Sequence, residues 1–236
     1  MSTPPPLDVS RIRAISLDLD DTLWPVWPAI ERAEQVLHRW LTDNAPATAR
    51  LFADAPALRA IRMQVGADLP HLAQDMSALR RESIRRALVQ AGDDPALADP
   101  AFDLFFAERQ RVDFYADALE ALERLAARWP LVALSNGNAD VHVVGIGHLF
   151  RAKVSARGCG VAKPDRRIFA AAADAVGVPM EAVLHVGDDV AADVVGALDA
   201  GMQAAWVNRA GLVWEHPCRP QAEVTELGAL CGLLGL

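Results

Sequence analysis

Residues 12–24 read IRAISLDLDDTLW, an apolar run that leads into three carboxylates within four positions. The apolar part predicts a buried strand over residues 12–18. Side chains two apart on a strand point to the same side, so Asp18 and Asp20 share a face that Asp21 does not easily join. Acids this close repel one another and resist burial. The stretch therefore predicts a strand that ends at a site where some partner offsets negative charge.

Helices and strands alternate after residue 115. Apolar strands are predicted at residues 131–135, near 153–156, at 182–187 and at 203–208, and helices at 117–129, 139–150, 165–177 and 190–201. Strands separated by helices of this length indicate a parallel sheet with right-handed crossovers. The expected fold class is α/β, with a three-layer doubly wound (Rossmann-like) parallel-sheet core.

The segment between the first strand and this series has a different pattern. Helical periodicity covers residues 31–41, 71–92 and 100–112, with a Pro- and Ala-rich stretch near 46–56 and no convincing strand. We therefore expect a catalytic core from residues 1–23 and 113–236, interrupted by an inserted α-helical cap domain at 24–112.

Composition limits the classes of function. The 236 residues are 52% hydrophobic and 23% charged, as in ordinary globular proteins, and the formal net charge is −8. Nucleic-acid and membrane-surface binders rely on a positive field, so a small-molecule substrate is expected, with no nucleic acid and no membrane as partner. The three cysteines are widely spaced and form no CxxC pair, and the sequence shows no signal-like or spanning segment. We therefore expect a cytoplasmic protein. A monomer or homodimer is expected.

Three later motifs place polar residues at or near predicted strand ends. LSNGN puts Ser135 and Asn136 after one strand, VAKPD offers Lys163, and GDDVAAD puts Asp188 after another strand with Asp193 one helical turn further on. Ligands bind beyond the carboxyl ends of strands in open parallel sheets. Each motif alone is equally well explained as a turn, a helix cap or a surface residue. Their occurrence together, in this order, indicates one shared site.

With DLDDTLW, LSNGN, AKPD and GDDVAAD, the chain resembles the haloacid dehalogenase superfamily, most of whose members are magnesium-dependent phosphatases. The resemblance covers nearly the whole chain, and the helical insertion looks like that family's cap of the first type. It implies that Asp18 is the nucleophile and Asp20 the acid/base. It also implies a Mg²⁺ site of Asp18, Asp20 through its backbone carbonyl, and Asp188, with Asp193 in support. The phosphate-binding residues implied are Thr22, Ser135, Asn136 and Lys163.

Elementary electrostatics agrees with those roles. An aspartate that approaches a phosphate dianion meets a repulsion of about 4 kcal/mol per pair of unit charges at ~4 Å, for an effective dielectric near 20. Mg²⁺ takes hard oxygen ligands and offsets that crowding. Lys163 adds a second positive charge, and Ser135 can hydrogen-bond the transferring phosphoryl group.

Three other activities stay open on the same residues. A 2-haloacid dehalogenase expels a halide that needs no proton, so it has no use for an acid at Asp20. A phosphomutase uses the same groups and differs in how it excludes water. A non-catalytic phospho-acceptor signalling module is about half this length and lacks an inserted cap.

Substrate choice is expected to depend on the cap. The core motifs look much like bacterial phosphatases that act on flavin mononucleotide and on 5-amino-6-(5-phosphoribitylamino)uracil, a riboflavin precursor. Trp24 and Arg80 are candidate substrate contacts, although packing between core and cap is the favoured explanation for Trp24.

Overall fold

The computed structural model describes residues 6–51, 53 and 55–236. The chain divides into two compact units, one formed by Met1–Pro25 with Asp113–Leu236 and the other by Val26–Val112. We call them the core unit and the helical unit. The helical unit begins at Val26, so Trp24 and Pro25 lie in the core unit, two residues beyond the boundary expected from the sequence.

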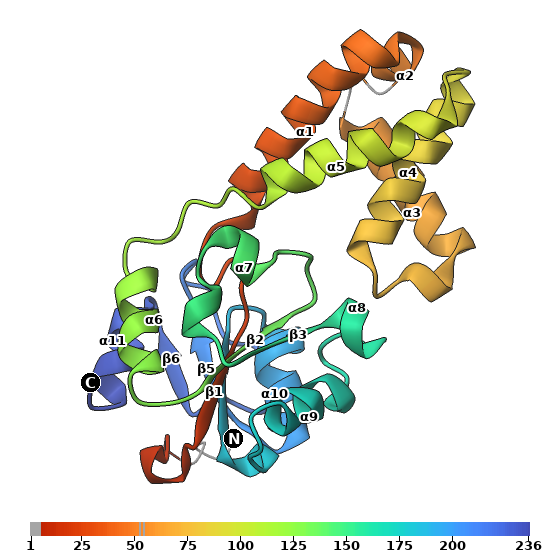
Figure 1. Cartoon of the computed structure of the whole chain (residues 1–236). Coiled ribbons are helices and arrows are strands. Elements are labelled where there is room, and N and C mark those ends of the chain that lie inside the picture. The colour runs from red at the N-terminus through yellow and green to blue at the C-terminus, as the bar shows by residue number, and fades with distance from the viewer. Residues whose placement is uncertain (1–5, 52, 54) are drawn as a thin grey trace. The chain divides into compact units, whose positions relative to one another are not determined.

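A six-stranded parallel sheet organises the core unit (Figure 1). Its strand order is β3-β2-β1-β4-β5-β6, which places the first strand of the chain in the middle. The strands are β1 Ala14–Leu17, β2 Leu131–Ser135, β3 Ala152–Ser155, β4 Val183–Gly187, β5 Gln203–Val207 and β6 Ala222–Val224. The predicted α/β class with a doubly wound parallel sheet is confirmed, and β6 is the strand that the sequence did not predict.

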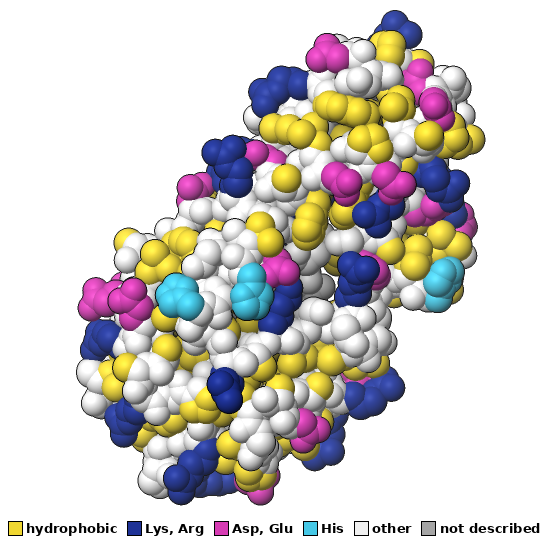
Figure 2. Space-filling view, in the orientation of Figure 1, with side chains coloured by type: hydrophobic (Ala, Val, Ile, Leu, Met, Phe, Trp, Pro, Cys, Tyr) yellow, Lys and Arg dark blue, Asp and Glu magenta, His cyan; other side chains and the backbone are white. Residues whose placement is uncertain are grey.

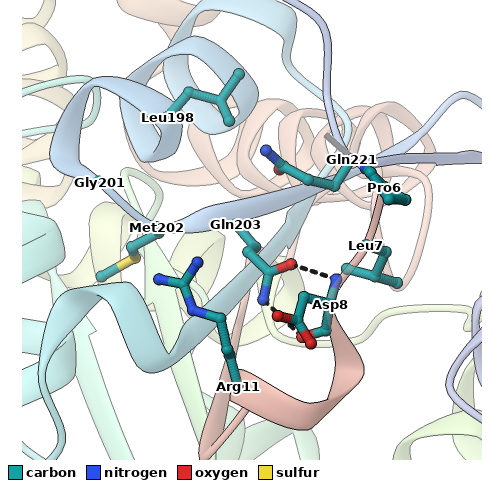
Figure 3. Close-up of a pocket in the computed structure, with 9 residues that line it drawn as sticks. All are labelled: Pro6, Leu7, Asp8, Arg11, Leu198, Gly201, Met202, Gln203 and Gln221. Atoms are coloured by element: carbon teal, nitrogen blue, oxygen red, sulfur yellow. Dashed lines mark hydrogen bonds between the residues drawn. The ribbon is translucent and has the colours of Figure 1, made fainter. Parts of the chain in front are cut away.

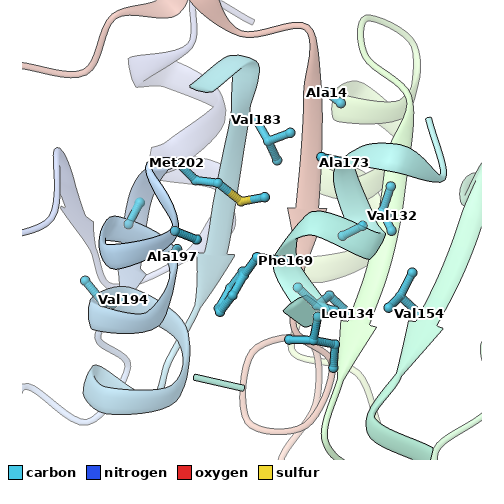
Figure 4. Packing of buried hydrophobic residues seen from close by; sticks show 14 of the residues in the cluster. Ala14, Val132, Leu134, Val154, Phe169, Ala173, Val183, Val194, Ala197 and Met202 are labelled. Atoms are coloured by element: carbon cyan, nitrogen blue, oxygen red, sulfur yellow. The ribbon is translucent and has the colours of Figure 1, made fainter. Parts of the chain in front are cut away.

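Both faces of the central strands are buried. The consecutive residues Ala14 and Ile15 of β1 point to opposite faces, and both are fully inaccessible to solvent, as expected for a parallel sheet covered on both sides. Helices α9 (Arg166–Asp174) and α10 (Gly196–Ala200) cover one face, where Phe169 fills the apolar cluster shown in Figure 4. Helices α6 (Ala118–Ala126) and α11 (Leu227–Leu233) lie on the other side of the sheet in Figure 1.

Two predicted helices of the core unit differ in detail from the structure. The stretch predicted as one helix at 139–150 contains only α7 (Val141–Val144) and a 3₁₀ turn, Gly147–Leu149. Gly145 has a φ of 98° and ends α7 in a left-handed conformation that a helix cannot continue through. The helix predicted at 190–201 begins as a π-helical segment, Val190–Val195, before α10.

Short elements complete the core unit. They are the helix α8 Ala156–Cys159 and the 3₁₀ turns Val9–Arg11 and Met180–Ala182.

The helical unit has its own apolar core. Its helices are α1 Val26–Asn44, α2 Pro46–Leu51, α3 Ala55–Asp68, α4 Met76–Ala91 and α5 Ala98–Arg109, with 3₁₀ turns at Pro70–Leu72 and Pro95–Leu97. Leu37, Leu88 and Phe105 are among the buried residues that hold them together. No strand occurs among the described residues of this unit, in line with its helical pattern. Helices α2 and α3 occupy the stretch that looked merely rich in Pro and Ala.

The surface carries both signs of charge. Basic and acidic side chains alternate over the face shown in Figure 2. Within the part of the chain that the structure describes, no helix combines the length and apolar character that crossing a membrane requires.

Candidate functional site

The site begins where β1 ends. Asp18 continues the strand direction for one residue, because its N–H donates to Val186 O at 2.9 Å. The chain then turns: Asp21 has a φ of 58°, a left-handed conformation that Asp tolerates better than most residues, and its N–H donates to Trp24 O at 2.7 Å. All three acids that follow β1, Asp18, Asp20 and Asp21, line the same cavity.

A cavity of about 230 Å³ lies at the carboxyl ends of the strands, entirely within the core unit. It brings together residues from all four motifs, as expected for polar groups that follow parallel strands. Of the residues predicted for the site, those that line it are Asp18, Asp20, Ser135, Asn136, Lys163, Asp188 and Asp193.

Lys163 is the positive centre of the cavity. Its Nζ donates to Asp18 Oδ1 at 2.5 Å and to Asp193 Oδ1 at 2.6 Å, and its side chain is only 2% exposed. Burial alone would lower the pKa of Lys163, but the two carboxylates outweigh burial and raise it. Lys163 is therefore a buried, permanently charged ammonium group.

Asp193 and Asp18 differ in protonation behaviour. Burial acts to raise the pKa of Asp193, yet Lys163 and His185 hold that pKa well below its usual range. Burial, together with the charges of Asp193 and Asp188, raises the pKa of Asp18 against the opposing effect of Lys163. The crowding of acids seen in the sequence is thus real, and Lys163 offsets only part of it.

Asp188 is fixed through both its side chain and its backbone. Its Oδ1 accepts the hydroxyl of Thr22 at 2.9 Å, and its carbonyl oxygen accepts Trp206 Nε1 at 2.7 Å. Burial and the nearby charge of Asp193 raise the pKa of Asp188 to about 7. Thr22 is fully buried and its hydroxyl supports this acid, while its contact with a phosphate stays a prediction.

The loop after β2 holds Lys163 by its backbone. The side-chain amide of Asn136 donates to Lys163 O at 3.0 Å and accepts from Lys163 N at 2.8 Å. The Asn136 amide therefore positions the backbone of Lys163, and its contact with a phosphate stays a prediction. Gly137 N donates to Ser135 Oγ at 2.9 Å, which leaves the Ser135 hydroxyl hydrogen to donate into the cavity.

Gly137 is required by its neighbours. A Cβ on Gly137 would stand 2.6 Å from Asp20 Oδ2 and 3.3 Å from Ser135 Oγ. Contacts of this length are not seen for real Cβ atoms, so glycine lets Asp20 approach the loop after β2. The carboxylate of Asp20 is thereby placed at the same cavity as Asp18.

The two candidate substrate contacts are engaged within their own units. Trp24 is fully buried, packs edge-on against Phe114 at 5.4 Å, and donates its Nε1 to Asp20 Oδ1 at 2.8 Å. Its indole packs within the core unit and orients Asp20, and its full burial leaves no exposed face for stacking on a substrate.

Arg80 in the helical unit bonds Glu34 at 3.1 Å and stacks on Phe105 at 4.1 Å. Burial, with the nearby charge of Arg62, lowers the pKa of Arg80 to about 10. These contacts describe a structural role within the unit.

The acids fit a hard divalent cation. One ligand atom each of Asp18, Asp188 and Asp193 lies within 4.8 Å of the others. Carboxylate oxygens are the donors that Mg²⁺ prefers. Both oxygens of Asp193 already accept hydrogen bonds from the protein, so Asp18 and Asp188 are the better ligands of the three.

Two residues of the site's surroundings were missed from the sequence. His185, in the middle of β4, contacts Asp193, and Trp206, on β5, contacts the backbone of Asp188. In the sequence, both residues fit the pattern of a buried strand. Only His185, a polar residue within the apolar run AVLHVG, could have indicated a role at the site.

A second, larger cavity of about 610 Å³ lies at the amino end of β5 (Figure 3). The Gln203 amide there donates to Asp8 O at 3.0 Å and accepts from Asp8 N at 2.8 Å, so it fastens the N-terminal segment to the sheet. Its lining contains none of the motif residues. The polar residues of the four motifs lie instead at the carboxyl ends of the strands.

A doubly wound parallel sheet with a buried lysine between carboxylates at its strand ends is the arrangement that the sequence motifs led us to expect. The chain belongs to the haloacid dehalogenase-like hydrolases, whose family description matches residues 12–201. The resemblance seen in the sequence is confirmed, and the protein is an enzyme of this family.

Similar proteins include phosphatases and a dehalogenase. The 5-amino-6-(5-phospho-D-ribitylamino)uracil phosphatase YigB of Escherichia coli (strain K12) is 34% identical, covering 96% of this chain and 98% of its own. A phosphoserine phosphatase of Thermus thermophilus is 34% identical over 92% of this chain and 96% of its own.

The solved structure of a 2-haloacid dehalogenase from Pseudomonas syringae pv. Tomato DC3000 is 36% identical. It covers 95% of this chain and 98% of its own, with a TM-score of 0.89.

Proposed function

We propose that this enzyme is a Mg²⁺-dependent phosphatase that hydrolyses a small-molecule phosphomonoester through an aspartyl-phosphate intermediate. The observation that carries the proposal is the presence of Asp20 beside Asp18 and Lys163 in one cavity. Expulsion of an alkoxide from phosphorus needs a proton donor, whereas expulsion of a halide does not. A second carboxyl group that Trp24 holds in place is therefore useful to a phosphatase and of no use to a dehalogenase.

The first half of the reaction uses both acids. A carboxylate oxygen of Asp18 attacks phosphorus and forms a new O–P bond while the ester O–P bond breaks. The electron pair of the broken bond leaves on the alkoxide oxygen, and Asp20 donates a proton to it. A positioned acid of this kind typically contributes about 10² to 10⁴ in rate.

The second half returns the enzyme to its starting state. Asp20, now ionised, takes a proton from water, and the water oxygen attacks the phosphorus of the aspartyl-phosphate. The bond between phosphorus and Asp18 breaks, which releases inorganic phosphate. Lys163 and the Ser135 hydroxyl bind phosphoryl oxygens throughout and oppose the charge that spreads over them.

Asp18, Asp188 and the backbone carbonyl of Asp20 would hold the metal. When bound, the divalent cation supplies positive charge that offsets the repulsion between the carboxylates and the phosphate dianion. Burial, with the charges of neighbouring acids, raises the pKa values of Asp18 and Asp188, and a bound cation would favour the ionised forms of both carboxylates.

We further propose flavin mononucleotide or 5-amino-6-(5-phosphoribitylamino)uracil as the substrate. The similarity to YigB over nearly the whole of both chains supports the second of these, and the resemblance of the core motifs seen in the sequence supports the first. The chemistry of the core does not select between organic groups.

A panel of substrates tests both levels of the proposal. Purified enzyme is assayed for phosphate release from the two proposed substrates, phosphoserine, sugar phosphates and p-nitrophenyl phosphate, with Mg²⁺ or with excess chelator. A 2-haloacid is assayed in parallel for halide release. Mg²⁺-dependent phosphate release is expected. Halide release with every ester inert would make the enzyme a dehalogenase, and turnover of an unrelated sugar phosphate alone would remove the two proposed substrates.

Asp18→Asn is the matched inactive variant. It should abolish turnover while circular dichroism stays that of the wild type. Asp174→Asn is its control, because Asp174 is an exposed acid at the end of α9 and does not line the cavity. Appreciable residual phosphatase activity in Asp18→Asn would mean that the nucleophile is another residue.

A further inference from the structure

A chain of buried polar groups leads from the middle of the sheet to the cavity. Ser16 and His185 are register partners on β1 and β4, and Ser16 Oγ lies 2.8 Å from His185 Nδ1. On the other side of the ring, His185 Nε2 lies 3.1 Å from Asp193 Oδ1. The same carboxylate oxygen accepts Lys163 Nζ at 2.6 Å. Four polar residues are thus linked in series, each at most 5% exposed.

The direction of each hydrogen bond follows from chemistry. The carboxylate of Asp193 only accepts, so His185 Nε2 must carry a hydrogen. In a neutral imidazole Nδ1 then accepts, and the Ser16 hydroxyl donates to it. Burial lowers the pKa of His185, and the charge of Lys163 acts in the same direction while Asp193 opposes both. Burial thus favours the neutral ring, and the contact with Asp193 places its hydrogen on Nε2.

Packing fixes the ring as firmly as the hydrogen bonds do. His185 is 1% exposed and meets the edge of Phe169 at 5.2 Å, with the rings nearly perpendicular. Phe169 belongs to the apolar cluster between the sheet and its helices (Figure 4). An apolar side chain would suit this environment better, because burying polar groups is costly unless every one is paired. A fully paired polar chain here indicates a role beyond packing.

Asp193 reaches this position because β4 ends in Gly187. A Cβ on Gly187 would stand 2.3 Å from Asp193 Cγ, so the carboxylate lies directly over the glycine. Oδ2 accepts Asp189 N at 3.0 Å, while Oδ1 is shared by Lys163 and His185. Without the donor from His185, the Oδ1 side of the carboxylate would be held by Lys163 alone.

We propose that His185 is a positioning residue that, through Asp193, holds Lys163 Nζ at the point where it meets Asp18 and the transferring phosphoryl group. The phosphoryl contact rests on the proposed function. The geometry of Lys163 does not, and the two are tested separately.

Two variants distinguish the effect of the hydrogen bond from His185 to Asp193 from the effect of the other contacts of the imidazole ring. The amide nitrogen of Gln is as many bonds from Cβ as His Nε2, so His185→Gln keeps a donor that reaches Asp193. The amide of Asn matches His Nδ1, so His185→Asn keeps the partner of Ser16 and loses the contact with Asp193. Both variants bury one amide at the same site, which makes their stabilities comparable.

Lys163 can be observed directly, because the chain contains only two lysines, Lys153 and Lys163. In protein labelled with ¹⁵N-lysine, each Nζ gives one signal, and Lys153 serves as the internal reference in its 3.0 Å ion pair with Asp140. We expect His185→Asn to shift or broaden the Lys163 signal only, with His185→Gln close to wild type. The inhibition constant of inorganic phosphate should rise about tenfold in His185→Asn, as is typical when a supporting hydrogen bond is lost, and stay near wild type in His185→Gln.

The outcomes are distinguishable. An unmoved Lys163 signal in His185→Asn, or equal disturbance in both variants, overturns the positioning role. The positioning role is also overturned if His185→Asn keeps the inhibition constant of the wild type for inorganic phosphate and only its folded fraction falls. That result would mean that His185 has a purely structural role. If the wild type releases no phosphate from any ester, the proposed function fails, and the Lys163 signal still decides the role of His185.

Discussion

Trp206 donates its indole N–H to the backbone carbonyl of Asp188 at 2.7 Å, which ties a residue of β5 to a proposed metal ligand. Trp206 is fully buried and packs edge-on against Trp214 at 5.1 Å. The Trp214 indole in turn donates to the carbonyls of His216 and Cys218, so the loop after β5 is folded around the same pair. Two indoles therefore brace the acidic loop after β4.

Trp206→Phe should weaken Mg²⁺ binding. The variant keeps an aromatic ring but leaves the Asp188 carbonyl without its donor, and loss of such support typically costs about tenfold or more in metal affinity. Calorimetric titration of wild type and variant with Mg²⁺ measures the change. Trp214→Phe is the matched control, because its lost bonds lie within the loop and not on Asp188. Equal affinities in Trp206→Phe and wild type would show that the brace has no effect on the metal.

Asp20→Asn should slow the hydrolysis of alkyl phosphates more than that of p-nitrophenyl phosphate. An alkoxide needs the proton of Asp20 and p-nitrophenolate does not, so we expect a loss of about 10² to 10⁴ in kcat/KM for the alkyl ester and a smaller one for the aryl ester. Steady-state assays of both esters with the same enzyme preparation give the ratio. The same loss for both esters would contradict a general-acid role in the first step.

Gly187→Ala should disturb the lysine site by overpacking. The new methyl group would stand 2.3 Å from Asp193 Cγ, in a carboxylate that Lys163 and His185 hold in place. We expect a loss of about 1 to 3 kcal/mol in the free energy of unfolding, with a large fall in kcat. Gly232→Ala in α11 is the control, since nothing lies within 4 Å of its new Cβ. Denaturant unfolding and turnover assays should show a lower free energy of unfolding and a lower kcat in Gly187→Ala than in Gly232→Ala. Similar values for both variants would contradict a close fit of Asp193 over Gly187.

Asp117 should make the stability of the core unit depend on pH. Its carboxylate pairs with Arg209 through two contacts of 3.0 Å and accepts Leu227 N at 2.6 Å. Burial acts to raise the pKa of Asp117, but these hydrogen bonds outweigh it and lower the pKa. The stabilisation is therefore present above the ordinary pKa of ~3.9 and is lost as pH falls through the lowered value.

Asp117→Asn tests that dependence. We expect it to reduce the free energy of unfolding at pH 7 by about 2 kcal/mol, below the range for fully buried pairs because the side chain is 17% exposed. Urea unfolding of wild type and variant from pH 7 to pH 2.5 should show the difference shrinking below about pH 4. A difference that stays constant over this range would mean that the carboxylate charge contributes nothing.

Much of the fold and the composition of the cavity could be predicted from the sequence. Asp18, Lys163 and Asp188 come together because each follows, or lies close after, a strand of the same parallel sheet, and strand ends meet at one edge. Orientation could not be predicted. Thr22 and Asn136 are polar residues within the right motifs, but their side chains are directed at Asp188 and at the Lys163 backbone.

Other features depend on contacts that sequence periodicity does not report. The helix expected at 139–150 is broken by the left-handed conformation of Gly145, although the apolar spacing continues past it. His185 lies in an otherwise apolar strand. The apolar pattern predicts that its side chain is buried, but it does not predict which groups the imidazole ring contacts. Trp24 is an aromatic residue beside a motif, and only its indole contact with Asp20 shows that it faces inward.

The order of the strands has a consequence for synthesis on the ribosome. The strand that carries Asp18 emerges first, yet its two neighbours in the sheet, β2 and β4, begin at Leu131 and Val183. Pairing between such distant segments is slow, because a long loop must close before any contact rewards it. The nascent N-terminal strand must therefore wait for most of the polypeptide, while the five helices of Val26–Val112 can already form a compact body of their own.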